Sequence, residues 1–223
     1  MSKQTIWNEL KRRGFSDSAA AAIMGNMEAE SKCVSFRVQG DFSKDYKYSA
    51  DYTAQVDAGN ISQHEFVYDG PGGGGYGLCQ WTYPSRKAGL YFQTFNDWQC
   101  SIGDEALQIA WLTSELKQPE FSKVMQTLKT SVSIKECSDV FCKQFERPAD
   151  QSEAALKERS DYGRAFYQEF SQAEAEDPDG IPEVNGKIEI TEEQLRTFSK
   201  AMLVVKTLRD LLEMVNDFDD QEG

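Results

Sequence analysis

Two glutamates near the end of an alanine-rich segment are the first candidates for chemistry. Glu28 and Glu30 lie in MGNMEAES at residues 24–31. Two residues apart on a helix, they point to different faces, so only one can face a given cleft. A carboxyl at the C-terminal end of a helix is poorly solvated and lies at the negative end of the helix dipole, which helps it keep the proton that a general acid needs. The alternative is that both are ordinary solvated glutamates.

A glycine-rich segment, GPGGGGYGLCQWT at residues 70–82, forms the second group. Its glycines would let a ligand approach the main chain closely. Tyr76 and Trp81 offer aromatic faces for stacking, and Gln80 offers an amide that suits an acetamido group. The alternative is a flexible hairpin tip whose aromatic residues belong to the core. The segment is not a phosphate-binding loop, because no GK[ST] follows it.

A thiol, an imidazole and three acids complete the candidates. Cys79 and His64, the single histidine, could form a cysteine peptidase pair, although a buried thiol and a surface histidine explain the same residues. Asp57, Glu65 and Asp69 lie between the two segments described above. One of them could act as a second carboxylate, and the alternative is that all three are solvated loop acids.

Helical patterns on both sides must position these residues. Apolar spacing predicts a helix over about residues 3–13 that ends at Gly14. Ser16 or Ser18 then caps a second, alanine-rich helix. Further helices are expected at about residues 104–116, 119–130, 133–145 and 150–171.

The segment over residues 34–75 has a different composition. It is rich in Tyr, Asp, Ser and Gly, which predicts a long loop or a small β-like lobe rather than a helix. An irregular stretch of this length inside a compact domain usually serves a function, such as lining a binding site.

Charge and hydropathy exclude several classes of protein. Most of the net charge of −13 lies in residues 173–223, which carry 14 acids and 5 bases. Neither this region nor residues 1–172 has the basic surface expected of a nucleic-acid binder. No apolar run suits a signal peptide or a membrane span, which predicts synthesis in a cytoplasm without Sec export and no membrane insertion. The five cysteines favour reduced, mostly buried thiols over a disulfide framework.

Two motifs, in the right order, resemble those of a known family. Residues 22–31, AIMGNMEAES, resemble the IMGN-x-x-x-ES signature of phage tail-type lysozymes and related endolysins. Residues 76–82, YGLCQWT, resemble the GYGL-x-QWT signature of that family, and residues 57–69 and 145–148 (FERP) resemble further stretches. The ES pair and the GL-x-Q element are also similar to goose-type lysozymes and soluble lytic transglycosylases. The resemblance covers about residues 3–171.

The resemblance implies a mainly α, lysozyme-like α+β domain with the long loop or small β lobe over a sugar cleft. It implies a phage or prophage endolysin that hydrolyses the β-1,4 bond between N-acetylmuramic acid and N-acetylglucosamine in bacterial peptidoglycan, without metal or cofactor. The catalytic acid would be Glu30, supported by Asp69 or Asp57. The substrate-binding residues would be Asn26, Tyr76, Gly77, Gln80 and Trp81.

Three alternatives stay open. A lytic transglycosylase would cut the same bond, although the chain has no clear match to the AYN-type tyrosine motif of those enzymes. A Cys79 endopeptidase would cut peptide bonds instead. A non-catalytic virion protein that binds the wall would keep the fold alone.

The domain organisation is expected to have three parts. Residues 1–172 form the catalytic domain, and residues 173–187 form an acidic linker with Pro and Gly. Residues 188–223 form an amphipathic helix whose apolar stripe predicts packing or self-association rather than wall binding. An acidic polar face disfavours a membrane-surface role.

Overall fold

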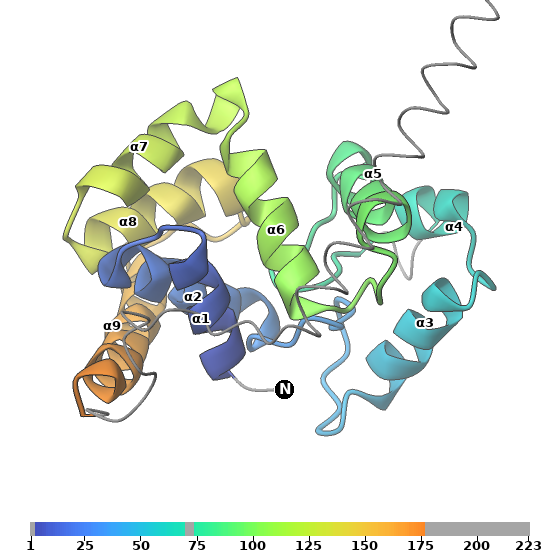
Figure 1. The fold of residues 1–223 in the computed structure, drawn as a ribbon, viewed down its shortest axis with the longest axis horizontal. Helices are drawn as coiled ribbons and strands as arrows, with labels where there is room; N and C mark the ends of the chain where they lie inside the picture. Colours follow the sequence, from blue (N-terminus) through green and yellow to red (C-terminus); the bar gives the residue numbers. More distant parts are fainter. Residues whose placement is uncertain (1–2, 70–73, 177–223) are drawn as a thin grey trace, which may run out of the picture. The chain divides into compact units, whose positions relative to one another are not determined.

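The computed structural model describes residues 3–69 and 74–176, which are mainly helical as predicted (Figure 1). The α-helices are α1 (Lys3–Arg12), α2 (Asp17–Ser31), α3 (Lys47–Asp57), α4 (Gln63–Tyr68), α5 (Pro84–Phe92), α6 (Glu105–Leu116), α7 (Ser122–Thr130), α8 (Ile134–Phe141) and α9 (Glu153–Glu176). Two π-helical turns, η2 (Gln93–Trp98) and η4 (Cys142–Glu146), continue α5 and α8, and a 3-10 turn, η3 (Pro119–Phe121), precedes α7. None of the described helices is long and apolar enough to cross a membrane.

The ends of α2 place Glu30 in its last turn. Ser16, one of the two predicted caps, accepts a hydrogen bond from the main-chain N–H of Ala19 at 3.2 Å. At the other end, Lys32 adopts a left-handed conformation (φ 59°), and its N–H bonds back to carbonyls of the final turn. The helix therefore stops at Ser31, directly after Glu30.

Close packing of α2 against α9 depends on a glycine in each helix. A Cβ atom on Gly25 would lie 2.4 Å from the carbonyl oxygen of Arg159 and 2.6 Å from the main-chain nitrogen of Gly163. Only a residue without a side chain lets the two backbones come this near. This contact brings Arg159 of α9 to the end of α2.

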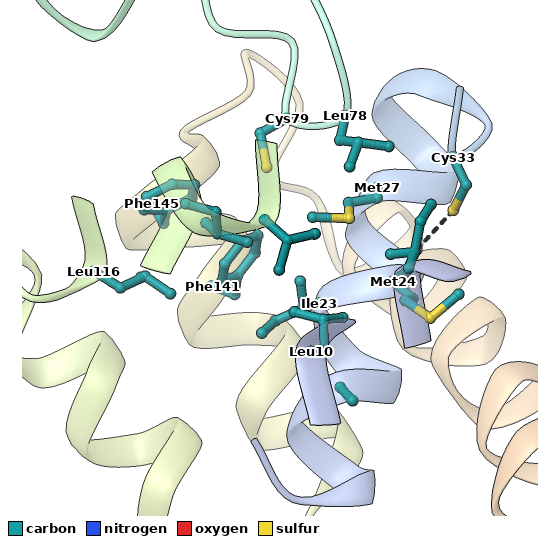
Figure 2. Close-up of a cluster of buried hydrophobic side chains, with 14 of the residues drawn as sticks. Leu10, Ile23, Met24, Met27, Cys33, Leu78, Cys79, Leu116, Phe141 and Phe145 are labelled. Atoms are coloured by element: carbon teal, nitrogen blue, oxygen red, sulfur yellow. Dashed lines mark hydrogen bonds between the residues drawn. The ribbon is translucent and has the colours of Figure 1, made fainter. Parts of the chain in front are cut away.

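The core surrounds α2, in which residues 19–27 are buried. Figure 2 shows Ile23 of α2 beside Leu10 of α1, with Met24 and Met27 of α2 and residues from α6, α8 and η4 in the same cluster. The apolar faces predicted from spacing are buried, and Ile6, Trp7 and Leu10 are each 0% exposed. Four of the five cysteines are buried, and all five are free thiols, as expected.

The segment over residues 34–75 departs from the prediction, because it contains α3 and α4. The buried face of α3 consists of Ser49, Thr53 and Val56, which have helical spacing but only one large apolar side chain. The polar composition therefore concealed the helix. β structure in the described residues is limited to isolated bridges that join Tyr76 to Val38 and to Trp81.

The expected acidic linker and C-terminal helix lie almost wholly outside the described residues. The backbone of α9 continues to Glu176, four residues past the expected end of the catalytic domain. All described residues belong to one compact unit, Met1–Asp177.

Candidate active site

A cleft of about 470 Å³ opens at the C-terminal end of α2. Its lining combines two acids, two amides, two arginines and an exposed tyrosine with smaller residues: Glu30, Glu146, Gln39, Gln80, Arg86, Arg147, Tyr83, Cys79, Thr82, Pro148 and Ala149. The lining comes from four separate parts of the chain, so the cleft exists only in the folded domain.

An arginine from α9 holds the Glu30 carboxylate in place. The Nη2 atom of Arg159 donates to Oε1 of Glu30 at 2.7 Å, and the Glu30 side chain is 19% exposed. Arg159 is 8% exposed, and its other terminal nitrogen lies 3.3 Å from Oδ1 of Asn26. The Asn26 amide nitrogen donates to the carbonyl of Ala22 and to Ser138. Asn26 was predicted to bind substrate, whereas the structure buries it behind Arg159.

The serine of the ES pair fastens the glycine-rich segment to α2. Its hydroxyl, Oγ of Ser31, lies 2.9 Å from the carbonyl oxygen of Leu78 and 3.0 Å from that of Met27. On the other side, Oε1 of Gln108 accepts from the N–H of Leu78 at 2.9 Å. A Cβ on Gly77, which has a φ of 80°, would lie 2.6 Å from that same oxygen. Gly77 thus shapes the turn, and it does not line the cleft.

Gln80 lies where the sequence predicts it, in the cleft wall. Its Nε2 donates to the carbonyls of Gly77 at 2.8 Å and Arg37 at 3.1 Å. Because both amide hydrogens are used, the group that Gln80 can offer to a ligand is its carbonyl oxygen. It can therefore accept one hydrogen bond from an acetamido N–H, but cannot bind that group in a bidentate manner.

Trp81 and Tyr76, both predicted to contact sugar, are buried instead. Trp81 is 0% exposed, and its Nε1 donates to Oε2 of Glu115 at 2.6 Å. The Tyr76 hydroxyl lies 2.7 Å from Oγ1 of Thr53, and its ring packs edge-on against Phe66. The exposed aromatic residue of the cleft is Tyr83, which is 60% exposed.

An ion pair fixes another part of the cleft wall. Arg86 of α5 donates to both carboxylate oxygens of Glu115, at 2.7 and 3.0 Å. The same guanidinium lies 3.3 Å from the carbonyl oxygen of Phe145 and 4.2 Å from the centre of its ring. Phe145 directly precedes Glu146. Arg86 therefore links α5 and α6 to the segment of η4 that carries Glu146.

Glu146, at the end of η4, is the second carboxyl of the cleft. Burial raises the pKa of Glu146 well above the ordinary glutamate value, and the charge of Glu30 raises it further. Arg86, Arg159 and the thiol of Cys79 act in the opposite direction without overcoming burial. The Oε1 atom of Glu146 is buried and has no hydrogen-bond partner among residues 3–69 and 74–176.

Neither aspartate expected to assist Glu30 lines this cleft. The Asp57 carboxylate accepts from the hydroxyl of Ser101 at 2.6 Å and the N–H of Ile102 at 2.8 Å, so it fastens a loop to the end of α3. Asp69 is exposed at the end of α4, with His64 Nδ1 3.1 Å from its Oδ2.

The thiol and the imidazole have different surroundings. His64 is exposed beside Asp69, whereas Cys79 is buried and points toward Met27 and Phe145 in Figure 2. Burial raises the pKa of the Cys79 thiol well above its ordinary value, and the charge of Glu146 raises it further. A thiolate nucleophile is therefore disfavoured at this position. The described residues also contain no group of three or more side chains that could hold a metal ion.

Sequence reasoning assigned no role to Glu146, Arg159 or Tyr83. Arg159 is 129 residues from Glu30 along the chain, and no local pattern joins the two. The available signal for Glu146 was its place in the FERP stretch, which carried no role of its own. Tyr83 follows the GYGL-x-QWT element directly, beyond the last residue of that motif.

Comparisons with known proteins agree with the geometry. No curated protein matches the chain. A family model described as phage tail lysozyme matches residues 2–170, which includes every residue that lines the cleft. The chain therefore belongs to the phage tail lysozyme family, as its two motifs indicate.

Proposed function

We propose that the protein is a phage or prophage endolysin that hydrolyses the β-1,4 bond between N-acetylmuramic acid and N-acetylglucosamine in peptidoglycan. The observation that carries the proposal is the position of Glu30: a carboxyl in the last turn of α2, oriented by a buried arginine and open to the cleft. Membership of a lysozyme family supports peptidoglycan as the substrate.

In this proposal Glu30, once protonated, is the general acid. Its proton passes to the bridging oxygen as the bond from that oxygen to C1 breaks, and an oxocarbenium-like centre develops at C1. Water then adds to C1, and the proton that it releases restores the carboxyl. Arg159 keeps the carboxyl in one orientation through this cycle, since its guanidinium is itself held by Asn26.

The rest of the lining supports a carbohydrate ligand. Tyr83 offers an exposed ring that can stack on a sugar face, and Gln80 offers a carbonyl oxygen to an acetamido N–H. Gln39 and Arg147 add further polar groups to the lining. A mostly polar cleft suits a hydroxyl-rich polymer better than an apolar ligand.

Mass spectrometry of the fragments released from purified peptidoglycan tests the proposal. Hydrolysis predicts glycan fragments with reducing N-acetylmuramic acid ends. Anhydro ends would identify a lytic transglycosylase, and fragments cut in the peptide would identify an endopeptidase. Either result, or the absence of any release, would overturn the proposal.

A further inference from the structure

One cation in the lining of the cleft has no role in the mechanism above. We propose that Arg147 is a specificity-determining residue that binds a carboxylate of the peptide carried by N-acetylmuramic acid, so that the enzyme prefers peptide-bearing glycan. The inference rests on the proposed function, because it names the form of peptidoglycan that the cleft accepts. Arg147 contacts a substituent of the sugar and takes no part in bond cleavage.

The two arginines of the lining differ in the donors that they can offer to a ligand. All three side-chain nitrogens of Arg86 are occupied, since Nε and Nη2 donate to Glu115 and Nη1 donates to the carbonyl of Phe145. Arg147 is exposed, and its Nε donates to the carbonyl of Gln144 at 2.8 Å. Within the described part of the chain its two terminal nitrogens have no hydrogen-bond or ion-pair partner. Their N–H groups form the planar fork that binds a carboxylate through two parallel hydrogen bonds.

The guanidinium of Arg147 is held in place although it is exposed. Its central carbon lies 5.7 Å from the centre of the Phe121 ring, which is 3% exposed, so the ring gives it a fixed surface. The bond to the Gln144 carbonyl restrains the same group from a second direction. A side chain that is already restrained loses less conformational entropy when a ligand binds.

The backbone at Arg147 suits a glycine better than an arginine. Its φ of 53° and ψ of 49° are left-handed, and its N–H closes η4 by donating to the carbonyl of Cys142 at 2.8 Å. A Cβ atom disfavours this conformation, and Pro148 favours an extended backbone in the residue before it. The turn itself therefore does not require an arginine.

The chemistry of peptidoglycan identifies the anion. N-acetylmuramic acid carries a lactyl group at C3, and a short peptide with free carboxylates is joined to that group through an amide. The peptide is therefore attached to the same sugar whose C1 is released when Glu30 protonates the bridging oxygen. Arg147 and Glu30 line one cleft of about 470 Å³, a volume typical of a single ligand site. One sugar can thus present its C1 to Glu30 and its peptide to Arg147.

Neutralisation of the substrate tests the inference with the wild-type enzyme. Solubilised peptidoglycan, freed of phosphate-bearing wall polymers, is compared with the same material after carbodiimide and ammonia have converted its carboxylates to amides. Loss of one charge-assisted pair predicts that kcat/KM for reducing-end release falls about tenfold on the amidated polymer. The value of kcat should change little, because the pair forms in the ground state as well as in the transition state. Equal kcat/KM values on both polymers would overturn the inference.

Variants of Arg147 show whether that residue reads the charge. Arg147→Gln should lower kcat/KM about tenfold on the untreated polymer and leave it unchanged on the amidated one. Arg147→Lys keeps the charge without the planar fork and should recover part of the difference. Lys143→Gln removes an exposed cation from the same η4 turn, outside the cleft lining, and should match the wild type on both polymers. If Arg147→Gln still distinguishes the two polymers by the wild-type factor, Arg147 does not read the peptide.

Arg147→Gly covers the case in which glutamine disturbs the turn. Glycine adopts the left-handed conformation without a steric penalty, so this variant should unfold in urea close to the wild-type midpoint. It should nevertheless lose the preference for the untreated polymer. A folded Arg147→Gly protein that keeps the preference would show that the side chain has no part in it.

Amidase-treated peptidoglycan separates the two carboxylates that an arginine in this cleft could meet. The amidase removes the peptide and leaves a free lactyl carboxylate on the sugar. On this polymer the wild type and Arg147→Gln should have the same low kcat/KM. A wild type that stays about tenfold ahead of Arg147→Gln would place the recognised carboxylate on the lactyl group and reject the role of the peptide.

The two proposals fail in distinguishable ways. A wild type that releases no reducing ends contradicts the proposed function, while co-sedimentation of the protein with untreated and amidated walls still tests the binding by Arg147. A wild type that releases reducing ends equally well from both polymers keeps the function and rejects the role of Arg147.

Discussion

Cys79 shows at the scale of single residues how a reactive side chain can have a packing role. Its thiol is buried in the apolar cluster that also contains Met27 and Phe145, and the nearby acids Glu146 and Glu115 disfavour a thiolate. The single histidine is exposed beside Asp69. The residue therefore fills space beneath the cleft next to the second carboxyl.

Cys79→Ala should retain most of the wall-lytic activity, because no step of the mechanism uses the thiol. The loss of a small buried side chain should lower the free energy of unfolding by about 1–2 kcal/mol. Activity is measured by turbidity of a wall suspension and stability by urea unfolding. A folded Cys79→Ala protein without activity would instead support a cysteine peptidase.

Two residues of the site could be predicted because they lie within short sequence motifs. Glu30 and Gln80 fall within short motifs, and both line the cleft. Asp57 and Asp69 were selected because they lie between those motifs, but proximity along the chain does not bring a loop acid to the cleft. Glu146 is 116 residues from Glu30, and only tertiary packing places it there.

Caps and apolar spacing decide which helices can be predicted from the sequence. The caps and apolar spacing of α1, α2 and α6 were sufficient to predict those helices from sequence. The α3 helix escaped prediction because its buried face is largely Ser and Thr. The α4 helix was also missed, because it has only six residues. Its capping box of Ser62 and Glu65 is nevertheless a recognisable start signal.

Gly25→Ala tests the packing of α2 on α9. Within an isolated helix this change is stabilising by up to about 1 kcal/mol. Here the new Cβ would lie 2.4 Å from the Arg159 carbonyl oxygen, so we expect the domain to be less stable by about 1–3 kcal/mol. Activity should fall further than stability predicts, because displacement of α9 moves Arg159 away from Glu30.

Gly163→Ala provides the graded comparison on the facing helix. Its Cβ would lie 3.0 Å from the Ala21 carbonyl oxygen and from Cγ2 of Ile134, so a smaller adjustment is enough. Thermal unfolding and wall lysis of both variants give the comparison. A Gly25→Ala protein as stable and active as the wild type would show that the two helices do not need this contact.

Asp41 ties the loop before α3 to that helix and makes stability depend on acid pH. Its carboxylate accepts from the N–H and hydroxyl groups of Ser43 and Ser49 at 2.5–3.0 Å. The bonds from Ser43, then those from Ser49, lower the pKa of Asp41 to about 2 against the opposing effect of burial. A depressed folded pKa stabilises the protein above the unfolded value of about 3.9, and this is lost as pH falls toward 2.

Asp41→Asn should therefore be less stable than the wild type at pH 7, by about 1–3 kcal/mol. The difference should shrink as pH is lowered from about 4 to 2, where the wild-type carboxyl takes up its proton. Urea unfolding at both pH values measures it. Asp51→Asn, which removes an exposed partner of Lys47 on α3, should change little at either pH. A difference for Asp41→Asn that does not vary with pH would contradict the assignment.

Charge is distributed unevenly over the whole molecule, and most of the excess acid lies in residues 173–223. The apolar stripe predicted within that region consists of Leu195, Phe198, Met202, Val205, Leu208, Leu212 and Val215. In water, an apolar stripe of this length must be shielded from solvent by other protein surface, so we expect self-association or packing. These residues lie outside the described part of the chain, and the expectation rests on sequence alone.

Removal of residues 178–223 tests that expectation. Light scattering should give a larger mass per chain for the full protein than for the shortened one, or else the shortened protein should be less stable. Equal monomers of equal stability would contradict the packing role. If the shortened protein no longer sediments with cell walls, the region is a targeting segment.

The central claim for the whole molecule is that Glu30 performs the bond cleavage. Glu30→Gln keeps the size of the side chain and removes its proton, so reducing-end release from purified peptidoglycan should fall at least ~100-fold with an unchanged circular dichroism spectrum. Glu28→Gln, two residues away on the same helix, removes a partner of Lys3 and should release reducing ends at nearly the wild-type rate. Wild-type release by a folded Glu30→Gln protein would contradict the account.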